Sequence, residues 1–454
     1  MTPPDESPSQ SASLDARRAA LSMLAKVLDR HESLDDALGA EPGLKALDGR
    51  DRAFARLLVM TALRRHGELD ALIAGALERP LAKSARAIRH ILALGICQLL
   101  MLGTPPHAAV DTSVRLAAGV SGGRFKGLTN AVLRRMGREG KGRLAALDGP
   151  RLNTPDWLWA LCEKTYGAQA AQAIAEAHQL EPPLDLSLRD PIEASTWIAR
   201  FEAAGIEAEC PLPGSLRLKH AGRIEALAGF KAGAWWVQDA AAALPVRLLA
   251  GGDAATLWGK RVLDLCAAPG GKTLQLVAAG ARVTAVDQSA DRLRRVGANL
   301  ARLGLSAELI AADGRAFDAG APFDHVLLDA PCSASGTIRR HPDIPHIKGA
   351  EDARRLAPLQ DQLLAKAAEL TAPGGGLVYA VCSLDPGEGV DRIEAFLSLR
   401  PDFQRRPIAA QDEGLDPGWV TAEGDLRTLP CHLADRGGMD GFFAARLKRN
   451  LAAL

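Results

Sequence analysis

Apolar residues recur at three- and four-residue steps through residues 14–148, which is the spacing of amphipathic α-helices. One series is Leu21, Leu24, Val27 and Leu28, and further apolar helices are expected at 88–102 and 110–118. Pro105 and Pro106 separate the last two, because proline cannot donate the hydrogen bond that a helix interior requires. The pattern predicts an all-α bundle of about six or seven helices over residues 14–148.

The pattern changes after residue 148. Short apolar runs with one helix between them predict a small α+β subdomain over residues 149–235. From residue 236 to 454, apolar strands alternate with helices, which predicts an α/β, Rossmann-like domain with a mostly parallel sheet. Residues 1–13, rich in Ser and Pro, are expected to form a disordered tail. The predicted fold class is therefore multi-domain.

Composition adds little to this picture. A chain of 454 residues with 47% hydrophobic and 24% charged residues is typical of a globular protein of two or three domains. The net charge of +1 does not indicate a polyanionic partner, but one segment, 124–143, is strongly basic. Its acid is Glu139, and its basic residues are Arg124, Lys126, Arg134, Arg135, Arg138, Lys141 and Arg143. Both a solvated helix face and a phosphate-binding surface fit this run.

The cysteines indicate the compartment. Seven cysteines are scattered without a C-x-x-C pair, which argues against a disulfide framework or a zinc module. We therefore expect no metal and a reducing, cytoplasmic location. No apolar run approaches the roughly 18–20 residues of a membrane span, so we expect no membrane partner.

The stretch from Val262 to Thr273 carries the first candidate chemistry. A short strand runs into a Pro-Gly-Gly turn and then a helix, an arrangement whose backbone N–H groups cradle a polar ligand. Acids follow three later strands, at Asp287, Asp313 and Asp329. Because ligands of open α/β sheets bind beyond the carboxyl ends of the strands, and a carboxylate there suits a ribose diol, the pattern favours a nucleoside-type cofactor.

A nucleotide-hydrolysing P-loop is the rival interpretation. Gly271-Lys272-Thr273 matches the end of a Walker A motif. The first glycine of that motif would fall at Cys266, however, and Pro269 removes an N–H from the loop. The pattern favours the cofactor site.

Two cysteines follow neighbouring strands. Cys332 lies in Asp-Ala-Pro-Cys-Ser (329–333) and Cys382 in Tyr-Ala-Val-Cys-Ser (379–383). A single buried cysteine is usually packing. Two at adjacent strand ends, on the edge that carries the glycine turn, favour a catalytic role.

These motifs, together with Asp-Leu-Cys-Ala-Ala-Pro-Gly-Gly-Lys-Thr (264–273), resemble the RNA 5-methylcytosine methyltransferases that use S-adenosyl-L-methionine. The segment 329–344 is similar to the branch that modifies small-subunit (16S) ribosomal RNA, the methyltransferase B family. Segments 51–56, 63–70, 105–110 and 130–135 are similar to the NusB-like RNA-binding domain of that branch. The resemblance covers nearly the whole chain beyond the first dozen residues.

The resemblance implies roles for individual residues. Asp287 would hold the ribose, Asp313 the adenine side, and Asp329 would lie between cofactor and target base. Cys382 corresponds to the nucleophile and Cys332 to the residue that helps to release the product. The methionine part of the cofactor would be held by Cys266, Ala267, Ala268, Pro269, Gly270, Gly271 and Lys272.

The chain also departs from the family pattern. Ala380-Val381 stands where the family often has Ser-Thr, and Arg189 is followed by Asp190 where relatives often have Arg-x-Asn. The segment Arg339-Arg340-His341 fits an RNA-backbone contact and a solvated loop about equally.

The expected chemistry explains the need for a thiol. Carbon 5 of cytosine is a poor nucleophile, and thiolate addition at carbon 6 makes it reactive toward a methyl sulfonium. We expect helix N-termini and the cationic cofactor to favour the thiolate of Cys382. The implied partner is ribosomal RNA with an unstacked cytosine in a loop or junction, either naked or in an assembling small ribosomal subunit, bound by a monomer. A tRNA 5-methylcytosine methyltransferase and a non-enzymatic NusB-like RNA-binding scaffold are the alternatives.

Overall fold

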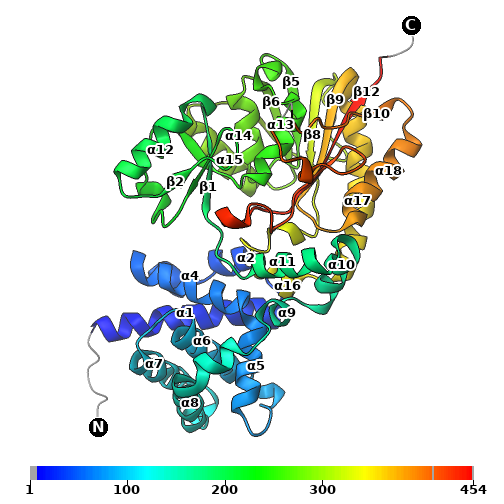
Figure 1. Cartoon of the computed structure of the whole chain (residues 1–454). Coiled ribbons are helices and arrows are strands. Elements are labelled where there is room, and N and C mark those ends of the chain that lie inside the picture. The colour runs from blue at the N-terminus through cyan, green and yellow to red at the C-terminus, as the bar shows by residue number, and fades with distance from the viewer. Residues whose placement is uncertain (1–7, 412–413, 452–454) are drawn as a thin grey trace. The chain divides into compact units, whose positions relative to one another are not determined.

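A computed structural model describes residues 8–411 and 414–451 (Figure 1). The chain forms two compact units. The first comprises the residues up to Gln179 together with Arg340–Gly349, and the second comprises Leu180–Arg339 and the residues from Ala350 onward. No helix in the described ranges is both long enough and apolar enough to cross a membrane.

The first unit is helical. Eight α-helices lie between residues 8 and 145 of the described chain. This exceeds the expected number because α2 and α3, with six and five residues, are too short to produce a helical periodicity. The helices are α1 (Pro8–Arg30), α2 (Leu34–Gly39), α3 (Pro42–Ala46), α4 (Gly49–Arg64), α5 (His66–Ala76), α6 (Arg86–Leu100), α7 (Pro106–Ala118) and α8 (Lys126–Ala145).

Helix α6 is the centre of this unit. Its residues from Ile91 to Gln98 are all buried, and they pack among α1, α4, α5, α7 and α8. Burial also raises the pKa of the Cys97 thiol to about 12, as for an inert core cysteine. Three more helices complete the continuous part of the unit: α9 (Gly149–Asn153), α10 (Asp156–Tyr166) and α11 (Ala168–His178).

Helix α1 corrects the expected N-terminal tail. It begins at Pro8, so residues 8–13, which we expected to be disordered, are helical. Residues 1–7 of the expected tail lie outside the described residues.

The segment Arg340–Gly349, which contains α16 (Ile344–Ile347), belongs to the helical unit although its neighbours in sequence do not. The carboxylate of Asp343 accepts a hydrogen bond of 2.9 Å from the Leu34 amide at the start of α2. His346 Nε2 lies 2.9 Å from the carbonyl oxygen of Leu63. These contacts fix the segment within the first unit.

The second unit begins with a four-stranded antiparallel sheet in the order β2-β3-β1-β4. Trp197 and Phe201 of α12 (Ala194–Ala203) pack with Leu186, Leu216 and Trp235 of this sheet. The strands are β1 (Leu184–Leu188), β2 (Ala208–Glu209), β3 (Ser215–Leu218) and β4 (Trp235–Val237).

An eight-stranded sheet dominates the second unit, in the order β10-β12-β9-β8-β5-β6-β7 with β11 paired to β12. Strands β7, β6, β5, β8 and β9 are parallel, as the alternating pattern predicts, whereas β10, β11 and β12 join antiparallel. The strands are β5 (Arg261–Leu265), β6 (Arg282–Asp287), β7 (Glu308–Ala311), β8 (Phe323–Asp329), β9 (Thr371–Val381), β10 (Phe403–Arg405), β11 (Leu426–Arg427) and β12 (Phe443–Arg449).

The strand order positions a ligand site. From β5 the chain proceeds outward to β6 and β7 on one side, and then crosses to β8 and β9 on the other. A crevice for a ligand forms where the order reverses in this way, outside the carboxyl ends of the strands. In this protein that point lies after Leu265 of β5 and Asp329 of β8.

Helices cover both faces of the sheet. Val262 and Val378 pack with α13 (Leu244–Ala250) and α14 (Gly271–Ala278) on one face. On the other face Leu263 and Leu377 pack with α17 (Ala350–Leu370) and α18 (Val390–Leu399). Since alternate residues of each strand are buried on opposite faces, the core strands are largely apolar, with Asp264 of β5 as a fully buried exception.

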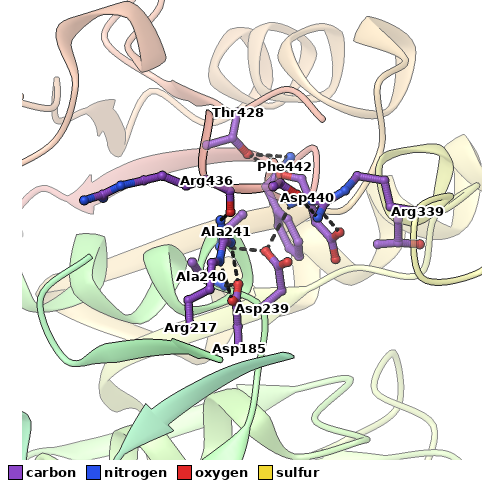
Figure 2. A network of polar contacts seen from close by, with 12 residues as sticks. Asp185, Arg217, Asp239, Ala240, Ala241, Arg339, Thr428, Arg436, Asp440 and Phe442 are labelled. Atoms are coloured by element: carbon purple, nitrogen blue, oxygen red, sulfur yellow. Dashed lines mark hydrogen bonds and ion pairs between the residues drawn. The ribbon is translucent and has the colours of Figure 1, made fainter. Parts of the chain in front are cut away.

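A buried ion pair links the small sheet to the C-terminal segment of the second unit (Figure 2). Arg217 of β3 donates from Nε and Nη2 to the two carboxylate oxygens of Asp185 in β1, at 2.7 and 2.8 Å, and neither side chain is exposed. Arg217 also donates to the Arg436 carbonyl, and Asp185 accepts from the Ala240 amide. The pair therefore ties three stretches of chain together.

A second part of this network reaches the segment before β12 (Figure 2). Asp239 accepts hydrogen bonds from the amides of Ala241 and Asp440. The hydroxyl of Thr428 donates to the Asp440 carbonyl and accepts from the Phe442 amide. The network thus holds the backbone at Phe442.

Candidate active site

The glycine turn follows β5 as expected. Cys266 has a φ of 64°, and the Ala268 amide donates to the Asp287 carboxylate at the end of β6, at 3.1 Å. Gly270 has a φ of 102°, and a Cβ there would lie 2.8 Å from both methyl groups of Val296. Only glycine fits this position, so the turn can pack its backbone directly against Val296 of α15 (Ala290–Leu303).

Asp264 of β5 is hydrogen-bonded to Thr273, just after the glycine turn. Its carboxylate is fully buried and accepts a 2.5 Å hydrogen bond from the Thr273 hydroxyl. Burial raises its pKa to about 7 despite this bond. The last strand residues and the first turn of α14 are therefore held together by a polar contact inside the core.

Lys272 connects the turn to β8. Its ammonium donates to Asp329 Oδ2 at 2.7 Å and lies 5.1 Å from the centre of the Phe442 ring. Burial opposes the charged form, but the Asp329 carboxylate outweighs it, so the pKa of Lys272 is raised. The lysine is a buried, fully charged group at the point where the strand order reverses.

The two candidate cysteines meet. Cys332 Sγ and Cys382 Sγ lie 3.4 Å apart, and both residues are half-buried. The pairing of β8 with β9 places Asp329 opposite Ala380, so the residues that follow each strand come together. The hydrogen bond to Cys382, burial and the nearby Glu388 charge raise the pKa of the Cys332 thiol well above its usual range.

Backbone contacts complete the arrangement around the thiols. The Gly336 amide donates to the Cys382 carbonyl at 3.0 Å, and the Gly441 amide donates to the Gly336 carbonyl at 2.8 Å. A Cβ at Gly336 would lie 1.9 Å from the Gly441 carbonyl oxygen. The loops after β8 and β9 and the segment before β12 are consequently in direct contact.

Comparisons with known proteins identify the family. Residues 256–448 match the model of the 16S rRNA methyltransferase RsmB/F family, and residues 14–138 match that of the NusB family. The ribosomal RNA small subunit methyltransferase B of Cronobacter sakazakii is 36% identical over 444 residues, covering 96% of this chain and 99% of that protein. That of Pseudomonas putida is 38% identical over 446 residues, covering 96% and 98%. This chain belongs to the RsmB/F methyltransferase family.

Solved structures agree on the fold of this RsmB/F member. The crystal structure of PH0851 has a TM-score of 0.74 at 22% identity and covers 96% of this chain and 99% of that one. NSun6 from Pyrococcus horikoshii with SFG has a TM-score of 0.55 at 19% identity, covering 65% and 98%. At these identities the likeness concerns the fold alone.

The predicted cofactor residues of this RsmB/F protein belong to the glycine turn or lie at or just after the ends of neighbouring strands. Asp287 accepts from the Ala268 amide of the turn and Asp329 from Lys272, and burial, followed by the charges of Asp329, Asp287 and Asp264, raises the pKa of Cys266. Asp313 follows Ala312, whose amide donates to the Asp287 carbonyl at 3.1 Å, and its exposed carboxylate accepts from the amide and guanidinium of Arg315. This pairing lowers the pKa of Asp313 to about 2.

Arg339 corrects one prediction. Its side chain is fully buried, donates to the Gly437 carbonyl at 2.7 Å and lies 3.9 Å from Asp440. It is therefore unavailable as an RNA-backbone contact. A fully buried arginine next to a half-buried one has no distinct signature in a single sequence.

The sequence patterns missed Glu388. It lies in the turn η8 (Pro386–Glu388), its side chain is fully buried, and it contacts the residues next to both cysteines. The string Asp385-Pro386-Gly387-Glu388 has the composition of an exposed turn. In the structure the Tyr379 hydroxyl also donates to the Glu388 carbonyl, at 2.6 Å, so residues of both cysteine motifs contact this turn.

Proposed function

We propose that this protein transfers the methyl group of S-adenosyl-L-methionine to carbon 5 of a cytosine in small-subunit ribosomal RNA, through a covalent adduct with Cys382. The observation that carries the proposal is the pair of sulfur atoms, 3.4 Å apart, at the ends of adjacent parallel strands. Family membership supports the substrate class, because curated relatives are named for small-subunit ribosomal RNA.

The residues around the glycine turn fit a cationic nucleoside cofactor. Burial, and then the negative charges of Asp329, Asp287 and Asp264, raise the pKa of the thiol of Cys266, the first residue after β5. An acidic surrounding suits a positively charged sulfonium, and Asp287 at the end of β6 suits a ribose diol. Residues 266–272 would hold the methionine part, with Asp313 on the adenine side. When bound, S-adenosyl-L-methionine supplies the electrophilic methyl group.

The side chains of this protein account for the remaining chemistry. The Cys382 thiolate would add to carbon 6 of cytosine, so electron density moves to carbon 5, which would form a bond to the methyl carbon while the methyl–sulfur bond breaks and leaves its electron pair on the donor's sulfur. Asp329, oriented by the 2.7 Å contact with Lys272, holds the base at its N3 edge. Carbon 5 then loses its proton to a base, and the bond to Cys382 breaks with its electron pair returning to sulfur.

Cys332 assists that last step. Its raised thiol pKa keeps the sulfur protonated, and a protonated thiol can donate a hydrogen bond. The leaving sulfur of Cys382 is within 3.4 Å. A hydrogen bond from Cys332 therefore stabilises the departing thiolate and favours release of the methylated base.

The helical domain would bind the RNA. In the basic segment of α8, Arg135 and Arg143 are paired with Glu139 and also donate to carbonyl groups of α5. Arg134 and Arg138 instead line a groove of about 580 Å³ beside α7. These two are the best candidates in the segment for phosphate contacts. We propose domains of 14–148 for RNA binding, 149–235 for a linking subdomain and 236–454 for catalysis.

Transfer of tritium from labelled S-adenosyl-L-methionine to ribosomal RNA tests the reaction, and bisulfite sequencing locates the modified cytosine. We expect Cys382→Ala to abolish transfer and Cys332→Ala to allow adduct formation but slow release. Transfer to tRNA in place of ribosomal RNA would establish the alternative substrate. RNA binding without transfer to either RNA would support a non-enzymatic scaffold.

A further inference from the structure

One buried carboxylate connects the loops of both cysteines. Glu388 Oε2 accepts hydrogen bonds from the hydroxyls of Ser333, at 2.5 Å, and Ser383, at 2.6 Å. Ser333 directly follows Cys332 and Ser383 directly follows Cys382. A single oxygen atom therefore joins the two serines that directly follow the cysteines.

The other oxygen is also engaged. Glu388 Oε1 accepts from the Ser333 amide at 2.9 Å and from Gln360 Nε2 at 3.0 Å. Gln360, fully buried on α17, also donates to the Pro331 carbonyl at 2.9 Å. Four donors thus converge on one fully buried carboxylate, and three of them belong to the loops that carry the thiols.

The chemistry of a carboxylate is required for this arrangement. An ionised carboxylate is acceptor-only, so both oxygens can accept from all four donors at once. An amide of the same shape replaces one acceptor oxygen by an NH2 group, so either the two serine hydroxyls or the Ser333 amide and Gln360 Nε2 then face a donor. Alanine leaves the Ser333 amide and the serine hydroxyls buried without this acceptor.

We propose that Glu388 is a positioning residue that holds Cys332 and Cys382 in reacting alignment by anchoring Ser333 and Ser383. The inference rests on the proposed roles of the two cysteines. The side chain of Glu388 is hydrogen-bonded to Ser333, Ser383 and Gln360, and none of them is a residue proposed to hold the cofactor. The effect of Glu388 is to keep the two thiols within contact distance, which the nucleophilic attack and the assisted release both require.

The experiment compares the full-length wild-type protein with Glu388→Gln, Glu388→Ala and the matched control Glu369→Gln, an exposed acid at the end of α17. Each protein is assayed for cooperative thermal melting, for single-turnover methyl transfer to ribosomal RNA and for S-adenosyl-L-methionine affinity by calorimetry. Diamide-induced disulfide formation between Cys332 and Cys382 is followed by mass spectrometry. Diamide accepts the two electrons and two protons released.

We expect Glu388→Ala to lower the transfer rate about 100-fold and the crosslinking rate at least about tenfold, because misplacement by about 1 Å has effects of this size. Glu388→Gln should lie between Ala and wild type in both assays. Cofactor affinity should stay within about twofold of wild type, since Glu388 contacts no cofactor residue, and Glu369→Gln should match wild type throughout.

Wild-type rates of transfer and crosslinking in Glu388→Ala would overturn the proposal. So would loss of cofactor binding and of cooperative melting in both Glu388 variants, because Glu388 would then be a folding residue. If wild-type protein transfers no methyl group to RNA, the proposed function fails, and the crosslinking comparison still decides whether Glu388 aligns the thiols.

Discussion

Replacing Asp185 by leucine should destabilise the second unit by about 3–5 kcal/mol, the usual cost of removing one partner from a buried ion pair. The structure explains this magnitude. Arg217 and Asp185 are both fully buried and joined by two hydrogen bonds of 2.7 and 2.8 Å. Without Asp185, the guanidinium charge is buried without its carboxylate, and the Ala240 amide loses its acceptor. Arg217→Met should cost a similar amount.

The double variant, Asp185→Leu with Arg217→Met, should lose less free energy of unfolding than the two single variants lose together. Both buried charges are then absent, and what remains is the loss of partners for the Ala240 amide and the Arg436 carbonyl. These cost about 1–3 kcal/mol each. We therefore expect a total loss of about 2–6 kcal/mol, against about 6–10 kcal/mol for independent changes.

Urea unfolding followed by tryptophan fluorescence measures these differences. Trp235 and Trp236 lie in β4, which pairs with the strand that carries Asp185, so their emission reports on this sheet. A double variant that loses as much as both single variants together would refute the argument from charge. A loss below about 1 kcal/mol in either single variant would show that the remaining charge is hydrated.

Three further predictions concern the site and the RNA surface. Asp264→Asn should remove part of the decrease in folding stability that occurs between about pH 4 and 7. In the folded wild type the Asp264 carboxyl has a pKa of about 7 and keeps a proton that the unfolded chain loses near pH 3.8. The stability that this proton contributes is therefore complete below pH 3.8 and is lost as the pH rises to 7. The difference is at most about 4 kcal/mol, and equal slopes in both proteins in pH-dependent melting would contradict it. Lys272→Met should lower single-turnover transfer at least about 100-fold, because Asp329 loses its 2.7 Å partner, and near-normal rates would exclude this role. The double variant Arg134→Glu with Arg138→Glu should weaken RNA binding and reduce the slope of log K against log salt concentration, measured by fluorescence anisotropy, by about 1.4–1.8. The control Lys164→Glu on α10 should change this slope little. Equal slopes for the double variant and the wild type would place the RNA elsewhere.

Local patterns in the sequence determined the helical bundle, the alternation of strands and helices in the second unit, and the glycine turn. Each depends on residues close together in the chain: periodic apolar positions for α6, and adjacent glycines for the turn after β5. The motifs at Cys332 and Cys382 were equally visible, and parallel strands require that residues at their carboxyl ends share an edge. Very short helices such as α2 escaped detection because one turn contains no full period.

Tertiary structure alone decided which polar residues are buried and what they contact. Glu388 and Arg339 have the sequence surroundings of exposed loop residues, yet both are fully buried, since loops distant in the chain enclose them. The same holds for the direction of β12 and for the contact between Lys272 and Asp329. A polar side chain in one sequence does not indicate its partner, because pairing free energy depends on burial and distance, and both are set only when the chain has folded.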